Sequence, residues 1–126
     1  MKSKQEIDAI NIQVIALFLA LISSVISIIT TYNQKLETEN KKTFLNSKQS
    51  YYLTLANRIL ILILALIFLY INYVLYTISK EEDEDLKPYR LQIWASVFTI
   101  TSAAIALYVV TLSGVENVAD VENPII

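Results

Sequence analysis

The chain alternates between long apolar segments and shorter polar connections. The apolar segments run from about Ile10 to Thr31, from Ile59 to Ile78 and from Leu91 to Ser113. Each approaches the roughly 20 residues that a helix needs to cross a hydrocarbon core of about 30 Å. Lipid offers no partners to backbone groups, and the alternation of a barrel strand is missing, so the segments are predicted to be helical. The pattern predicts an all-α integral membrane protein with three transmembrane helices.

The first connection, residues 32–58, contains no glycine or proline. The first two helices are therefore expected to continue beyond the membrane as a helical hairpin that turns near Asn40 or Asn46. At about 1.5 Å per residue, about ten extra residues would project this hairpin roughly 15 Å from the bilayer. The second connection, residues 79–90, is a short loop. The whole chain, 1–126, is predicted to form a single membrane domain.

The ends of the helices carry their own signals. Ser3 and Glu6 have the spacing of a capping box before the first helix. Pro88 suits the first turn of the third helix, and Gly114 suits its C-terminal cap. An acidic tail without lysine or arginine, residues 114–126, follows.

Composition excludes most other classes of protein. The chain has 126 residues, 55% of them hydrophobic and 17% charged, which is more apolar surface than a soluble domain of this size can hide. Cysteine and histidine are absent, and no nucleophile–base pair or metal-binding pattern is present, so we expect no enzymatic activity, metal or cofactor. The apolar segments hold no acidic residue, which argues against a proton-coupled transporter. A net charge of −2 predicts no general affinity for nucleic acid.

Orientation and location follow from charge and residue usage. The N-terminal tail and the second loop together carry five basic residues, and the first loop carries five as well, so the positive-inside rule gives a tie. The α-amino group and the tail without basic residues favour a cytoplasmic N-terminus and an outer C-terminus. Frequent isoleucine, lysine and asparagine are typical of AT-rich bacterial coding. Together with the three apolar segments, this residue usage predicts a multi-pass protein of the bacterial inner membrane.

Small and polar residues recur at helical spacing inside the apolar segments. On the first helix they alternate at spacings of four and three and comprise Ala9, Gln13, Ala16, Ala20, Ser23, Ser27, Thr30 and Gln34. The third helix carries a similar set, Gln92, Ser96, Thr99, Ala103, Ala106 and Ser113. On the second helix a seven-residue repeat comprises Arg58, Ala65, Asn72 and Ser79. The hydroxyl groups are therefore predicted to lie along seams, the lines on which one helix packs against another.

Two interpretations of these seams remain open. Small residues let membrane helices approach closely, and an interhelical hydrogen bond from serine or threonine adds about 0.6 kcal/mol, up to about 2. Alternatively, the hydroxyls and the amides of Asn11 and Gln13 line a water-filled path between several copies. Asn72 is expected to make a buried interhelical hydrogen bond. Several seams on only three helices exceed what one copy can bury, which favours a homo-oligomer in the lipid bilayer.

The two loops differ in charge. The second loop holds five consecutive carboxylates, Glu81, Glu82, Asp83, Glu84 and Asp85. They form either a solvated turn or, in a ring of copies, an anionic collar that concentrates cations, and their spacing does not match a calcium loop. The first loop offers a basic set, Lys41, Lys42, Lys48 and Arg58, for anionic lipid or an anionic cytosolic ligand such as a nucleotide. Arg58, at the edge of its apolar segment, is expected to reach lipid headgroups.

Two classes of function remain. The first is a homo-oligomeric pore or channel for small ions, for example a membrane-permeabilising effector of phage defence. In architecture alone the chain resembles a three-span phage holin, although its acidic tail departs from the basic cytoplasmic tail those proteins usually carry. The second class is a non-conducting accessory or scaffold subunit of a larger membrane complex.

Overall fold

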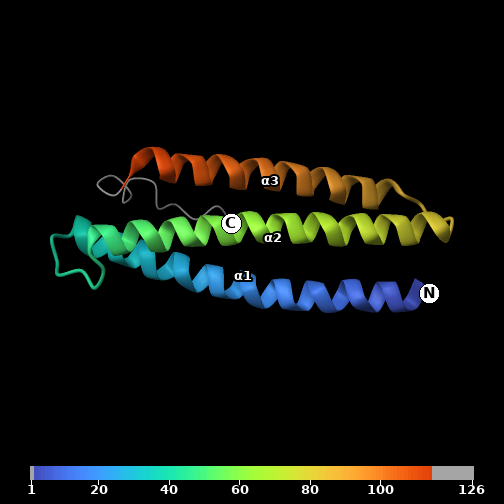
Figure 1. Cartoon of the computed structure of the whole chain (residues 1–126), viewed down its shortest axis with the longest axis horizontal. Helices are drawn as coiled ribbons and strands as arrows, with labels where there is room; N and C mark the ends of the chain where they lie inside the picture. The colour runs from blue at the N-terminus through green and yellow to red at the C-terminus, as the bar shows by residue number, and fades with distance from the viewer. Residues whose placement is uncertain (1, 115–126) are drawn as a thin grey trace.

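The computed structural model describes the backbone of residues 2–114 and the side chains from Lys4 onwards. They form three helices, α1 (Lys2–Thr38), α2 (Ser47–Glu81) and α3 (Lys87–Ser113) (Figure 1). By length and composition, each helix is long and apolar enough to cross a membrane. The prediction of an all-helical chain with three such helices is confirmed.

α2 lies between the other two helices. It packs against α1 and against α3, whereas α1 and α3 make little direct contact with each other (Figure 1). In the most apolar stretch of each helix, only 17% of the residues are buried within the chain. Most of the apolar surface therefore faces outward and needs a covering of lipid or of other protein.

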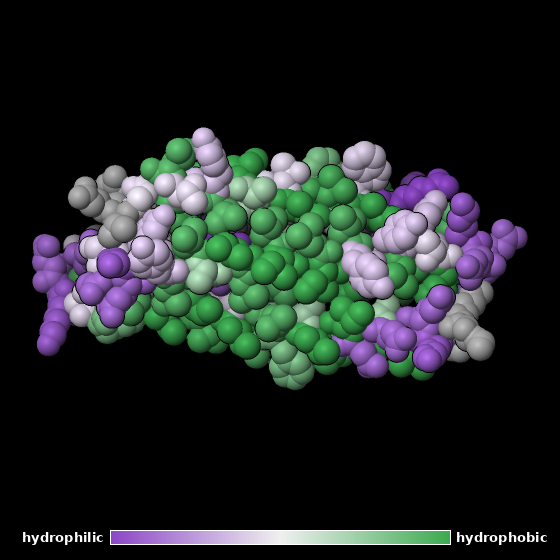
Figure 2. Space-filling model, in the orientation of Figure 1, coloured by the Kyte–Doolittle hydropathy of each residue, from purple (hydrophilic) through white to green (hydrophobic). Residues whose placement is uncertain are grey.

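The exposed apolar side chains form a band around the middle of the molecule. Figure 2 shows this band on one face, with hydrophilic residues gathered at both ends. All three helices contribute large exposed residues, including Phe18, Ile28, Tyr73, Phe98 and Leu112. This distribution of side chains is the one expected of helices whose middle lies in hydrocarbon and whose ends meet water.

The turn between α1 and α2 is built on two asparagines. Asn40 has a positive φ of 56°, and the backbone N–H of Lys41 donates to the carbonyl of Leu36 at 2.8 Å, as in a Schellman motif. Asn46 caps α2, where its side chain accepts from the backbone N–H of Gln49 (2.8 Å) and its own N–H donates to the Gln49 side chain (3.0 Å). Both positions where a turn was predicted take part in it.

The other helix ends agree in part with the prediction. Asp83 adopts a left-handed conformation after α2, Pro88 lies in the first turn of α3, and Gly114, with φ 69°, ends α3. The capping box predicted at Ser3 is wrong, because α1 already begins at Lys2 and Ser3 lies inside the helix. Apart from Gly114, the acidic tail lies outside the described residues.

Candidate functional site

The small residues of α1 face α2. The buried members of the predicted set are Ala9, Ala16, Ser23, Ser27 and Thr30, while Gln13, Ala20 and Gln34 are half-buried. Their short side chains allow the two helices to approach closely. Within one chain, therefore, this part of α1 forms an intramolecular packing surface.

Asn57 of α2 joins two serines of α1. The Ser23 hydroxyl donates to Asn57 Oδ1 at 2.6 Å, and Asn57 Nδ2 donates to the Ser27 hydroxyl at 2.9 Å. All three side chains are buried, and that of Ser23 is completely inaccessible. Asn57 was not among the residues predicted from the sequence. A signal exists, because Ser50, Thr54 and Asn57 stand at spacings of four and three like the set on α1, and all three are buried.

Asn33 holds the connection between α1 and α2. Its side-chain oxygen accepts from the backbone N–H of Leu45 at 3.0 Å, and its Nδ2 donates to the carbonyl of Leu45 at 3.4 Å. Asn33 is buried, and its two hydrogen bonds fix the backbone of Leu45 against the end of α1. Asn33 was also missed, because it lies just beyond the predicted apolar segment.

Many of the remaining hydroxyls are satisfied within their own helix. The hydroxyl of Ser24 donates to the carbonyl of Ala20 (3.1 Å), that of Thr99 to Ala95 (2.8 Å) and that of Thr101 to Val97 (3.0 Å). Further bonds of this kind are made by Thr30, Thr38, Thr77, Thr111 and Ser113. Such hydroxyls need neither water nor another helix, and an exposed hydroxyl alone does not indicate a pore.

Asn72 connects α2 to α3. Its Nδ2 donates to the Ser96 hydroxyl at 2.6 Å and to the carbonyl of Gln92 at 3.5 Å, and the Ser96 hydroxyl donates to the same carbonyl at 3.0 Å. These bonds use both protons of the Asn72 amide and leave its oxygen without a donor among the described residues.

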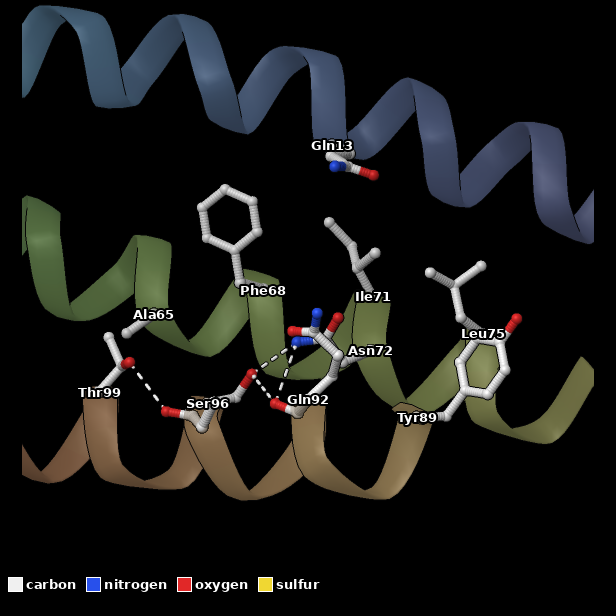
Figure 3. Close-up of a pocket in the computed structure, with 11 residues that line it drawn as sticks. Gln13, Ala65, Phe68, Ile71, Asn72, Leu75, Tyr89, Gln92, Ser96 and Thr99 are labelled. Carbon is white, nitrogen blue, oxygen red and sulfur yellow. Dashed lines mark hydrogen bonds between the residues drawn. The ribbon is translucent and has the colours of Figure 1, made fainter. Parts of the chain in front are cut away.

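All three helices border a half-open groove of about 470 Å³ beside this hydrogen bond (Figure 3). Its polar side chains are Gln13, Asn72, Tyr89, Gln92, Ser96 and Thr99. Its apolar side chains are Ala65, Phe68, Ile71, Leu75 and Ala95. We call this feature the amide groove, because the side-chain amides of Gln13, Asn72 and Gln92 line it. No Asp, Glu, Lys or Arg lines it among the described residues.

Two of the three amides make no hydrogen bond with the part of the chain that the structure describes. Among the described residues, the side chains of Gln13 and Gln92 make no hydrogen bond. Figure 3 shows Gln13 pointing in from α1, while Asn72 and Gln92 extend between α2 and α3 toward it. The sequence placed these residues on separate seams, and the fold brings them together.

The acidic residues lie at the same end of the molecule as the amide groove. Glu81 to Asp85 are all exposed at the turn between α2 and α3, near the N-terminus (Figure 1). Asp85 also accepts a hydrogen bond from the backbone N–H of Lys87 at 3.1 Å. Tyr89 and Gln92, which line the groove, follow on the first turns of α3. The carboxylates therefore lie close to one end of the groove.

The structure does not bring the predicted basic residues into one cluster. Lys41, Lys42 and Lys48 are exposed at the opposite end, where Lys41 Nζ lies 3.1 Å from Glu39 Oε2. Arg58 is only 7% exposed and lies about ten residues, or roughly 15 Å, further along α2 than Lys48. The expectation of an exposed Arg58 that reaches lipid headgroups is wrong, because its side chain is buried within the chain.

The remaining predicted positions vary in burial. Ala103 is buried on α3, Ala106 is half-buried, and Thr99 is exposed within the amide groove. Asn11 is exposed on α1 and does not line the groove. Its polar amide therefore lies on the outer surface of the single chain.

Other kinds of site find no support among the described residues. No group of three or more His, Cys, Asp or Glu is placed there to hold a metal ion. A second cavity, of about 190 Å³, lies between α1 and α2 and is bordered by Asp8, Tyr70 and Thr77 among others.

Comparison with known protein families, curated proteins and solved structures finds no match. The amide groove is accordingly interpreted from its own geometry.

Proposed function

We propose that this chain is a multi-pass membrane protein whose copies assemble into a homo-oligomeric pore for small ions. In this assembly the amide groove of each copy faces the shared lumen. The observation that carries the proposal is the groove itself, an uncharged and partly polar surface on otherwise apolar helices, with two amides that make no hydrogen bond among the described residues.

In this arrangement, lipid contacts the apolar band of the chain and water contacts the amide groove. The apolar band is long enough for hydrocarbon, and charged residues gather beyond both of its ends (Figure 2). Amides that face hydrocarbon without partners are costly, so the groove is more stable against water or another protein surface. An assembly that encloses several grooves supplies that water.

Self-association follows from the openness of the single chain. α1 and α3 barely touch, so one copy leaves the groove half open and most of its apolar residues uncovered. The exposed amide of Asn11 adds a second polar group that one copy does not cover. In the proposed assembly, further copies enclose the grooves around shared water and cover the apolar surface and Asn11.

The proposed lumen suits ions that bind briefly and leave. Neutral amides and hydroxyls hold an ion more weakly than a fixed charge does, and conduction requires release as well as entry. The exposed carboxylates from Glu81 to Asp85 near one end of the groove would raise the local concentration of cations. Cations are therefore the favoured permeant species.

Purified protein in liposomes tests this proposal. We expect a discrete oligomer by native mass spectrometry and a cation flux larger than the anion flux. Replacing all five residues, Glu81 to Asp85, by Gln or Asn should reduce the preference for cations while leaving the oligomer intact. An oligomer that never conducts, even when small residues replace the apolar neighbours of the groove, would contradict the proposal.

A second candidate is a non-conducting accessory or scaffold subunit, in which a different protein covers the groove. The hydroxyls of α3 that bond their own backbone favour it, because they do not require water. This alternative predicts that the purified chain stays monomeric until its partner is added. Native mass spectrometry of the chain alone therefore separates the two candidates.

The proposed orientation, with the N-terminus in the cytoplasm, is tested by labelling single cysteines. The chain contains no cysteine, so Lys42→Cys and Glu81→Cys each introduce a unique thiol at an exposed position. In intact cells of the expression host, an impermeant maleimide should react with the first variant and not with the second. Labelling of only the second variant would invert the orientation and place the basic turn in the cytoplasm.

A further inference from the structure

The amide groove has more hydrogen-bonding capacity than residues 4–114 use. The side chains of Gln13 and Gln92 each offer two donors and an acceptor, and the Asn72 oxygen is a further acceptor without a donor among the described residues. Figure 3 shows the amides of Asn72 and Gln92 close together between α2 and α3, and that of Gln13 across the groove on α1. A bound molecule that both donates and accepts can satisfy several of them together.

The chemistry of the groove favours an uncharged ligand. No Asp, Glu, Lys or Arg among the described residues lines it, so an ionised ligand would lose water without gaining a counter-charge. A carboxamide matches an amide lining best, because each amide group presents donors and an acceptor in one plane. The head of the ligand is therefore expected to be a neutral carboxamide.

The apolar side of the groove defines the rest of the ligand. Phe68, Ile71 and Leu75 of α2 lie opposite Gln13 and next to Asn72 (Figure 3). A volume of about 470 Å³ falls within the range of 300–1,000 Å³ that is typical of small-molecule sites. It accommodates an apolar body in addition to the polar head.

We infer that the amide groove is a binding site for a small, neutral, amphipathic carboxamide. The carboxamide head bonds to Gln13, Asn72 and Gln92, and the apolar body packs against Phe68, Ile71 and Leu75. The site belongs to a single chain, so it does not depend on the proposed pore.

Nuclear magnetic resonance of detergent-solubilised protein labelled with ¹⁵N at its glutamine side chains tests this site. Benzamide, which has an aromatic body and a carboxamide head, is the probe. We expect saturable shifts in the side-chain signals of Gln13 and Gln92 and none in Gln49, whose side chain is engaged in capping α2. Benzoate and benzylammonium carry the same body with a charged head and should bind at least about tenfold more weakly, a difference of about 1.4 kcal/mol.

A matched pair of variants locates the binding. Gln13→Leu should weaken benzamide binding by about tenfold, as loss of one hydrogen-bonding group from the site predicts. Asn11→Leu removes an amide two positions away that does not line the groove, and it should leave the affinity unchanged. An unshifted Gln49 signal in both variants shows that the fold is intact. Absence of saturable shifts, equal binding of the charged probes, or equal effects of the two variants would overturn the inference.

Discussion

Replacing Ser23 by leucine is expected to weaken the association of α1 with α2 by about 3 kcal/mol, because overpacking and an unpaired buried amide each cost about 1–3 kcal/mol. The Ser23 hydroxyl is fully buried and donates to Asn57 Oδ1 at 2.6 Å. Leucine would remove that donor and add volume at a completely buried position between the two helices. The two effects act on the same contact and should therefore combine.

Ser24 is the matched control for this change. It is half-buried, and its hydroxyl donates to the carbonyl of Ala20 in its own helix. Ser24→Leu should therefore change the association of the two helices by less than about 0.5 kcal/mol. Fluorescence energy transfer between dyes on Ile10→Cys and Tyr73→Cys, both at exposed positions, would follow helix separation during titration with denaturing detergent. Equal midpoints for the two leucine variants would refute the role assigned to Ser23.

Placing a tryptophan at Thr99 is expected to reduce ion flux through the assembled protein by at least about tenfold, or about 1.4 kcal/mol in the barrier. Thr99 is exposed within the amide groove, so an indole there would fill the space that the proposed lumen needs. Because the Thr99 hydroxyl donates to the carbonyl of Ala95 in its own helix, the change breaks no described hydrogen bond between helices. The reduction should therefore reflect blockage and not unfolding.

Thr101 provides the control for the tryptophan variant. It is exposed on the same helix and bonds the carbonyl of Val97 in the same manner, but it does not line the groove. Thr101→Trp should conduct like the unmodified protein in the same liposomes, with native mass spectrometry showing equal oligomers for both variants. Full conduction by Thr99→Trp would exclude the groove as the permeation path.

The ends of the helices could be predicted largely from local sequence. Asn40 and Asn46 bracket the first turn because asparagine tolerates the left-handed conformation and caps a helix N-terminus. Pro88 and Gly114 mark the ends of α3 for similarly local reasons. The failure at Ser3 has a local cause as well, since a capping pattern does not prevent a helix from starting two residues earlier.

The neighbours of the polar residues could not be predicted in the same way. Two heptad rows run side by side along α2, one through Asn57 and one through Asn72. Their hydrogen bonds show that the first meets α1 and the second meets α3. The burial of Arg58 was missed for the same reason, because sequence position near the edge of an apolar segment does not reveal which residues cover a side chain.

By itself, the sequence determined that the chain forms three long apolar helices and where they turn, because helix length, hydropathy and capping depend on residues close together in the chain. Only the tertiary structure decided what the polar residues do. Ser23 and Ser27 became partners of Asn57, whereas Gln13 joined Asn72 and Gln92 around an open groove. The physical reason is that helical periodicity groups residues on one face of one helix, but the rotation and tilt of each helix against its neighbours select which faces meet.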